Sequence, residues 1–221
     1  MRVVMRKFIL IFFLSTMSLL SACRAEWLTA DSLPWVGAGP VLFQDDFSKE
    51  TGGWNTHADA LSFSEYDQSG FRLSSDVPNY QFWSVPGLNF TDSLVYVRAR
   101  MLSGPENNLY GVVCRFQNSE NFYALMISSD GYYGIFKRFD GQQSMVGQSH
   151  MDFSATIQTG DGINDIKAIC QGDYLALFVN ETRLIQVRDD SLRFGDVGMI
   201  VGNLEEAGVN ILFDDFVVLK P

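Results

Sequence analysis

The sequence is poor in the residues on which most catalytic and metal sites depend. It has only two histidines, His57 and His150, which lie far apart, and three cysteines with no Cys-x-x-Cys pair. It also lacks a Gly-x-Ser-x-Gly elbow and a glycine-rich phosphate loop. These absences argue against the chemistries that such motifs serve, and either histidine is more typical of a surface residue than of a ligand or base.

Positive charge is scarce as well. The chain has 16 Lys and Arg against 26 Asp and Glu. Nucleic acids and anionic membrane surfaces are bound through clustered Lys and Arg, so neither is an expected partner. Three of the basic residues lie in the first seven, and removing residues 1–22 would leave the chain more acidic still.

Long apolar runs are absent except near the start of the chain. The run Phe8 to Leu20 follows basic residues and precedes the small residues Ser21 and Ala22. At about 13 residues it is too short to span a membrane as a stable helix, so residues 1–22 are predicted to form a secretory signal.

The end of this signal, Leu20-Ser21-Ala22-Cys23, resembles the bacterial lipobox. The resemblance implies that Cys23 is acylated and that the protein is extracytoplasmic, tethered to the bacterial membrane. The alternative is an ordinary cleavage site with a chance cysteine. Residues 23–39 contain turn formers without periodicity and are interpreted as a tether, and residues 40–221 as one folded domain.

Helical periodicity is also absent beyond residue 40. In the segment Tyr110 to Asp140, apolar residues alternate along three runs joined by short polar turns, and Asp130-Gly131 suits a hairpin. This segment is predicted to be an antiparallel meander with both faces partly apolar. Similar runs recur to the end of the chain, roughly thirteen or fourteen in all, which is typical of a two-sheet antiparallel jelly-roll sandwich.

The two ends of the domain resemble each other. Phe43-Gln44-Asp45-Asp46-Phe47 and Phe213-Asp214-Asp215-Phe216 share closely spaced Asp-Asp-Phe triplets. We therefore expect the first and last strands to lie near each other. Apolar residues change parity between Phe213 and Phe216, which predicts a β-bulge at Asp214-Asp215.

Cys114 and Cys170 both lie on the apolar phase of predicted strands. A disulfide between them is geometrically possible and would persist outside the cytoplasm. The alternative is two separate buried thiols.

With these residues in view, the domain resembles the concanavalin A-like superfamily, in particular the laminarinase-type and 3-keto-disaccharide hydrolase-type domains. The matching stretches are Phe43 to Phe47 with Gly53-Trp54, Asn121-Phe122-Tyr123, Asp130 to Gly134, Leu175 to Asn180, and Phe213 to Val218. The resemblance covers about residues 40–221 and is specific for fold rather than activity.

Laminarinase-type enzymes carry Glu-x-Asp-x-(x)-Glu on one strand, which supplies a nucleophile and an acid for retaining hydrolysis. Here Glu65-Tyr66-Asp67 begins such a motif, but Gln68, Ser69 and Gly70 follow in place of the second glutamate. No catalytic residue is therefore assigned.

In related jelly rolls a calcium ion ties the first strand to the last through carboxylates and backbone oxygens. The resemblance implies that Asp45, Asp46, Asp214 and Asp215 are candidate ligands of a structural calcium. The alternative is that these aspartates cap turns or lie solvated at strand ends.

Sugar-binding faces of jelly rolls combine aromatic rings with polar side chains in a concave site. Such a set is found among the meander residues that are expected to point away from the core and on the strand before the meander. It consists of Tyr96, Arg98, Arg100, Arg115, Tyr123, Tyr133 and Lys137. The alternative is an ordinary solvated sheet face with cross-strand Arg and aromatic pairs.

Three functions are compatible with these observations. The first is a lipid-anchored, non-catalytic module that binds a glycan or another cell-surface ligand. The second is a glycoside-processing enzyme of the 3-keto-disaccharide hydrolase type, and the third is a purely structural surface protein.

Overall fold

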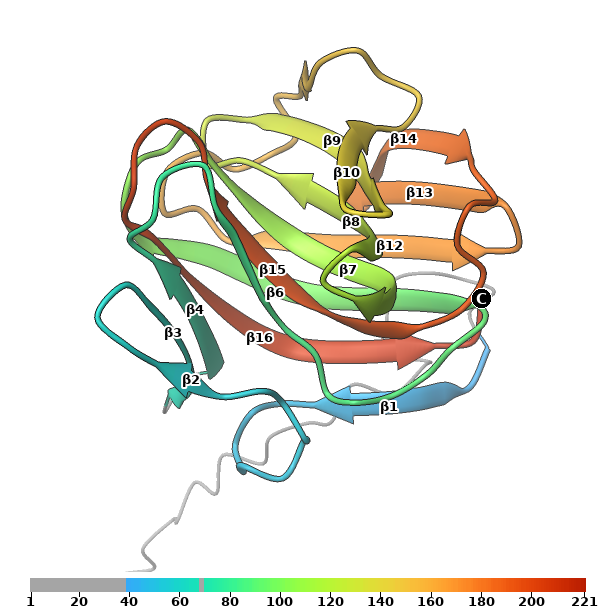
Figure 1. The fold of residues 1–221 in the computed structure, drawn as a ribbon, viewed down its shortest axis with the longest axis horizontal. Coiled ribbons are helices and arrows are strands. Elements are labelled where there is room, and N and C mark those ends of the chain that lie inside the picture. Colours follow the sequence, from blue (N-terminus) through green and yellow to red (C-terminus); the bar gives the residue numbers. More distant parts are fainter. Residues whose placement is uncertain (1–38, 68–69) are drawn as a thin grey trace, which may run out of the picture.

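The computed structural model describes residues 39–67 and 70–221, and every regular element in this part of the chain is a β-strand (Figure 1). Sixteen strands form two sheets in which all pairings between strands are antiparallel. The predicted all-β, two-sheet sandwich is therefore confirmed. No helix in residues 39–67 and 70–221 is long and apolar enough to cross a membrane. The predicted signal and Cys23 lie outside the described residues.

One sheet has nine strands and the other has seven. In spatial order the nine-stranded sheet contains β14 (Thr182–Arg188), β13 (Tyr174–Val179), β12 (Asn164–Gln171), β6 (Ser93–Ser103), β16 (Val209–Leu219), β4 (Gly70–Ser75), β3 (Ser62–Asp67) and β2 (His57–Ala58), and β1 (Val41–Asp45) also pairs with β16. The seven-stranded sheet contains β10 (Gln142–Met145), β9 (Tyr132–Phe139), β8 (Asn121–Ile127), β7 (Asn108–Asn118), β15 (Asp196–Asn203) and β5 (Gln81–Ser84), and β11 (Asp152–Phe153) pairs with β9.

Strand β16 joins the two ends of the domain. It pairs with β6 along one side, while its other side pairs first with β4, up to Phe213, and then with β1, from Phe216 onward. The change of partner coincides with a register shift after Asp214 and a positive φ of 52° at Asp215. The expected bulge and the expected proximity of the first and last strands are both confirmed.

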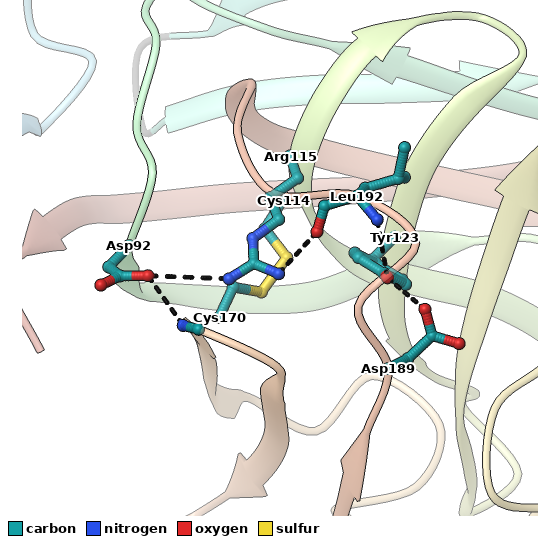
Figure 2. Close-up of a disulfide and its surroundings, with 8 residues drawn as sticks. Asp92, Cys114, Arg115, Tyr123, Cys170, Asp189 and Leu192 are labelled. Carbon is teal, nitrogen blue, oxygen red and sulfur yellow. Dashed lines mark hydrogen bonds and ion pairs between the residues drawn. A yellow bond between two sulfur atoms is a disulfide. The ribbon is translucent and has the colours of Figure 1, made fainter.

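The inner faces of the two sheets form one core, and a disulfide crosses it. Cys114 of β7 in the smaller sheet is bonded to Cys170 of β12 in the larger sheet, and both residues are fully buried (Figure 2). The predicted disulfide is confirmed, and its position shows that it fastens one sheet to the other.

The double substitution Cys114→Ala with Cys170→Ala is expected to lower the free energy of unfolding by about 2–4 kcal/mol, because the bond closes a loop of 56 residues in the unfolded chain. Chemical denaturation of the two proteins measures the difference. The double variant should also be insensitive to a thiol reductant, and equal stabilities of wild type and variant would contradict the expectation.

Candidate functional site

The outer face of the seven-stranded sheet is apolar, although the outer face of an antiparallel sandwich sheet is commonly polar and solvated. Its buried outward-pointing side chains are Leu109, Val113, Phe122, Ala124, Met126 and Ile200. The partly buried side chains that pack over them are Trp83, Phe116, Phe136, Met151 and Leu204. This face is therefore a second small core, covered by a few rings and loops instead of by a third layer.

The same face is strongly curved. Arg138 lies on β9 and Gln81 on β5, with β8, β7 and β15 between them. In a flat sheet, strands four steps apart would be roughly 19 Å apart. Nevertheless, Nη2 of Arg138 lies 3.3 Å from Oε1 of Gln81. The long Arg138 and Gln81 side chains span part of this distance, and a bend of β9 and the edge strand β5 toward each other accounts for the rest, which makes the outer face concave.

Two glycines on this face allow neighbouring side chains to pack closely against the sheet. Gly202 of β15 lies opposite Gln81, and a Cβ atom built on it would lie 3.2 Å from Cγ of Gln81. A Cβ atom on Gly134 of β9 would lie 2.6 Å from Cε of Met145, which covers it. Larger side chains at these two positions would displace the groups that line and cover the concave face.

A pocket of about 250 Å³ opens on this face, and we call it the Arg138 pocket. Its lining includes Tyr80, Gln81, Trp83, Arg138, Gln143 and Leu204. None of the described residues that line it is acidic. Aromatic rings beside amide and guanidinium groups in a hollow are the usual composition of a site for a polar small molecule.

Contacts on both sides hold Arg138 in this pocket. Its Nη2 donates to Oε1 of Gln143 at 2.9 Å, and its guanidinium carbon lies 5.3 Å from the centre of the Phe122 ring. The Trp83 ring in turn lies 5.4 Å from the Phe122 ring. The rings and the guanidinium group therefore form one continuous packed surface.

A second hollow adjoins the first across Leu204. It has a volume of about 380 Å³, and its lining includes Asp130, Tyr132 and Met151. The exposed Tyr132 ring packs edge-on against Phe153. Because both hollows share Leu204, a bound chain longer than one unit could contact both.

The seven residues predicted to form a binding face do not share one face. Tyr96, Arg98 and Arg100 lie on β6 in the larger sheet, whereas Arg115, Tyr123, Tyr133 and Lys137 lie in the smaller sheet. The four residues of the smaller sheet do not line the Arg138 pocket. The expectation of one shared polar groove is therefore corrected.

A bulge explains the position of Arg115. Strand β7 shifts register after Cys114, and Arg115 has a positive φ of 52°. Arg115 consequently leaves the outer face, and Phe116 takes a place there, although regular alternation would put Phe116 on the same face as Cys114. The Arg115 side chain is buried, donates to the carbonyl oxygen of Leu192 at 2.7 Å and lies 3.7 Å from the Asp92 carboxylate (Figure 2).

Tyr123 and Lys137 belong to the inner phase of their strands and converge on Asp189. Tyr123 is fully buried, and its hydroxyl donates to Asp189 and accepts from the Leu192 amide (Figure 2). Nζ of Lys137 lies 2.6 Å from Oδ2 of Asp189. Burial raises the pKa of Asp189, but the hydrogen bonds from Lys137, Tyr123 and Ser191 outweigh it and hold the pKa well below its usual range. These contacts anchor the segment after β14.

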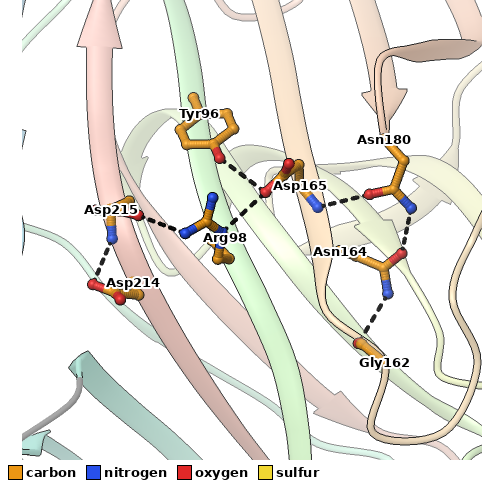
Figure 3. A network of polar contacts seen from close by, with 8 residues as sticks. All are labelled: Tyr96, Arg98, Gly162, Asn164, Asp165, Asn180, Asp214 and Asp215. Carbon is orange, nitrogen blue, oxygen red and sulfur yellow. Dashed lines mark hydrogen bonds and ion pairs between the residues drawn. The ribbon is translucent and has the colours of Figure 1, made fainter. Parts of the chain in front are cut away.

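On the larger sheet, Tyr96 and Arg98 belong to a polar network on the outer face (Figure 3). The Tyr96 hydroxyl donates to Asp165 at 2.8 Å, and Arg98 bridges Asp165 and Asp215. Burial, followed by the nearby Asp165 charge, raises the pKa of Tyr96. Arg98 and Arg100 line a shallow hollow with Ile163, Leu212 and Asp214, but ion pairs already use the Arg98 charge. This arrangement is typical of a solvated face with cross-strand pairs.

The four aspartates proposed as calcium ligands have protein partners. Asp45 accepts from the Phe47 amide and from Nε1 of Trp54, and Asp46 accepts from Ser48. Asp214 accepts from the amide of the next residue, whose own carboxylate pairs with Arg98. Within residues 39–67 and 70–221, no three His, Cys, Asp or Glu side chains gather so that they could hold a metal ion. The donor set as placed does not fit calcium, whose binding stays a prediction from the sequence.

Glu65 and Asp67 of the incomplete hydrolase motif lie on β3 of the larger sheet, and both flank Arg72, at 3.3 and 3.5 Å. His57 pairs with Asp59 at the surface, and His150 is also exposed. None of these residues lines the Arg138 pocket.

The sequence interpretation missed the residues of the Arg138 pocket. Arg138, Gln81 and Gln143 were not selected. Arg138 and Gln143 face each other on the adjacent strands β9 and β10, but only the curvature of the sheet brings Gln81 of β5 to them. The available signal was the apolar character of both meander faces, which predicts a second buried surface.

The sequence matches no protein-family model. It also matches no curated protein. Solved structures share the fold. A carbohydrate-binding module, CBM66, from Bacillus subtilis has 15% sequence identity and a TM-score of 0.63, and the alignment covers 76% of this chain and 96% of that one.

A Bacillus subtilis protein of unknown function with a galectin-like fold has 13% identity and a TM-score of 0.61, with 83% of this chain and 97% of that one covered. A Bacillus licheniformis β-glucanase has 12% identity and a TM-score of 0.56, with 81% and 97% covered. Likeness at this level of identity shows the fold alone, a two-sheet antiparallel jelly-roll sandwich.

Replacing Asp189 with Asn is expected to lower the free energy of unfolding by about 1–2 kcal/mol at pH 7, because Lys137 loses its charged partner. The folded pKa of Asp189 lies below the unfolded value of about 3.9. Its stabilising effect is therefore complete above that pH and is lost as the pH falls further. Urea denaturation at pH 7 and below pH 3 should show the difference between wild type and variant shrinking in acid.

Asp190→Asn is the matched control, because Asp190 is 74% exposed and pairs with Arg193 only at the surface. Its effect should stay below about 0.5 kcal/mol. Equal effects of the two substitutions would contradict the role given to Asp189.

Proposed function

We propose that this protein is a lipid-anchored, extracytoplasmic carbohydrate-binding module that holds its sugar ligand in the Arg138 pocket and does not cleave it. The observation that carries the proposal is the composition of this pocket. Aromatic rings lie beside amide and guanidinium groups on a concave sheet, and no acidic residue is among the described lining residues.

Each group in the pocket has a use in sugar binding. The rings of Tyr80 and Trp83 offer flat apolar surfaces on which the apolar face of a sugar ring can stack. Gln81 and Gln143 accept from Arg138 through their oxygens, so their amide nitrogens are left to donate to sugar oxygens. The likeness in fold to a carbohydrate-binding module supports the same class of ligand.

The alternative is a glycoside-processing enzyme of the 3-keto-disaccharide hydrolase type, and the likeness in fold to a β-glucanase favours testing it. Hydrolysis by the carboxylate mechanism needs two acidic side chains on either side of the sugar bond. Asp130 is the one acidic residue among the described residues that line the two hollows. This composition supports binding over cleavage. Sugar release from a bound glycan would favour the enzyme, and a protein that neither binds nor cleaves glycans would be a structural surface protein.

The extracytoplasmic location is supported by the disulfide between Cys114 and Cys170, since such bonds persist mainly outside the cytoplasm. The lipobox-like stretch before Cys23 supports membrane attachment through acyl chains. Such an anchor leaves the folded domain in water, where its concave face can meet a glycan.

Tyr80→Ala is expected to weaken binding to a glycan ligand about tenfold, because it removes a stacking surface without opening the core. Tyr80 is 45% exposed, so the fold should survive. Affinity electrophoresis on a panel of polysaccharides, followed by titration calorimetry with the ligand found, measures the effect.

Phe194→Ala is the matched control. It removes a ring that is 53% exposed and does not line the pocket. An equal loss of affinity in both variants, or no loss in Tyr80→Ala, would place the ligand elsewhere.

Cys23→Ala is expected to abolish the incorporation of labelled fatty acid into the protein, because it removes the acylated thiol. Labelling of cells with a palmitate analogue, followed by immunoprecipitation, measures the change. The variant that lacks Cys114 and Cys170 should still be labelled. Labelling of the Cys23→Ala protein would rule out this anchor.

A further inference from the structure

No carboxylate of the described residues forms an ion pair with Arg138. Of the eight arginines in residues 39–67 and 70–221, five have a carboxylate within 4.0 Å: Arg72, Arg98, Arg115, Arg188 and Arg193. Arg100 and Arg183 have none, but both are exposed to water. Arg138 is therefore the one partly buried arginine of this part of the chain without an acidic partner.

The hydrogen-bond partners of Arg138 among the described residues are all neutral. Its nitrogens lie 2.9 Å from Gln143 Oε1, 3.3 Å from Gln81 Oε1 and 3.4 Å from the carbonyl oxygen of Ser119, and its Nε is buried without a partner. Two of the three contacts are long for hydrogen bonds. They fix the position of the guanidinium group but leave its charge unpaired, at a cost in desolvation.

We infer that the ligand is a saccharide that carries a carboxylate, such as a uronic acid, and that Arg138 is the residue that selects it. The inference rests on the proposed function and adds the charge of the ligand. A planar guanidinium group can donate two parallel hydrogen bonds to a carboxylate. The amide groups of Gln81 and Gln143 lie on either side and can donate to the neighbouring hydroxyls.

The surroundings favour a ligand with no more than one negative charge per sugar ring. Glu205 and Glu206 follow Leu204 at the rim, are exposed and make no ion pair with Arg138. The chain as a whole has 26 acidic against 16 basic residues. A sugar with several negative charges per ring would be repelled by this surface, whereas a sugar with one carboxylate per ring can place that group on Arg138.

The test compares polygalacturonate with the same polymer after methyl esterification, and alginate with neutral xylan, by affinity electrophoresis and calorimetry. The wild-type protein should bind one of the acidic polymers at least about tenfold more tightly than its neutral counterpart. This preference should weaken with added salt, because it depends on charge.

Arg138→Gln should abolish the preference, and Gln143→Glu should do the same by placing a carboxylate against Arg138. Gln143 is exposed, so the second variant keeps the inference testable if the first does not fold. Arg183→Gln is the matched control, since it removes an exposed positive charge outside the pocket and should leave the preference intact.

The outcomes separate the inference from the proposed function. Tyr80-dependent binding that is equal for acidic and neutral polymers, or unchanged in Arg138→Gln, overturns the inference alone. Absence of binding to every polymer overturns both. A preference lost in Arg138→Gln and in Gln143→Glu but kept in Arg183→Gln supports both.

Discussion

The seven-stranded sheet carries apolar side chains on both faces, and the arrangement of the candidate site depends on this constraint. The inner face is covered by the larger sheet, and the disulfide between β7 and β12 fastens the two layers. Within the described part of the chain no further layer covers the outer face, which is buried by its own curvature, by Trp83 and by nearby loops. A concave apolar surface with polar groups at its edges results, and this surface forms the two adjoining hollows.

Much of the fold could be predicted because the patterns that encode it are local. Alternating apolar residues and turn residues indicated the strands, and the change of parity between Phe213 and Phe216 indicated the bulge in β16. The bulge in β7 gave no such signal. Both faces of β7 are apolar, so a shift that moves Phe116 from one face to the other leaves the pattern unchanged.

The candidate site could not be predicted for a related reason. The interpretation assumed that the polar phase of the meander faces solvent, but Tyr123 and Lys137 belong to the inner phase and bind Asp189. The residues that do meet, Gln81 and Arg138, are 57 positions apart in the sequence and lie on strands separated by three others. Their contact depends on sheet curvature, which no local pattern encodes.

The proposed binding would give Arg138 two roles that require different partners. As a structural group, Arg138 reaches across the concave face and contacts Gln81 on the edge strand β5. An acidic residue in place of Gln81 would strengthen this contact. As a binding group, Arg138 needs its charge, which an acidic partner would neutralise. Two glutamines satisfy both requirements, because their oxygens fix the guanidinium group and carry no charge. Ion pairs elsewhere, such as that of Arg98, show that the chain has carboxylates to place beside arginines. The neutral surroundings of Arg138 are therefore better explained by ligand binding than by stability.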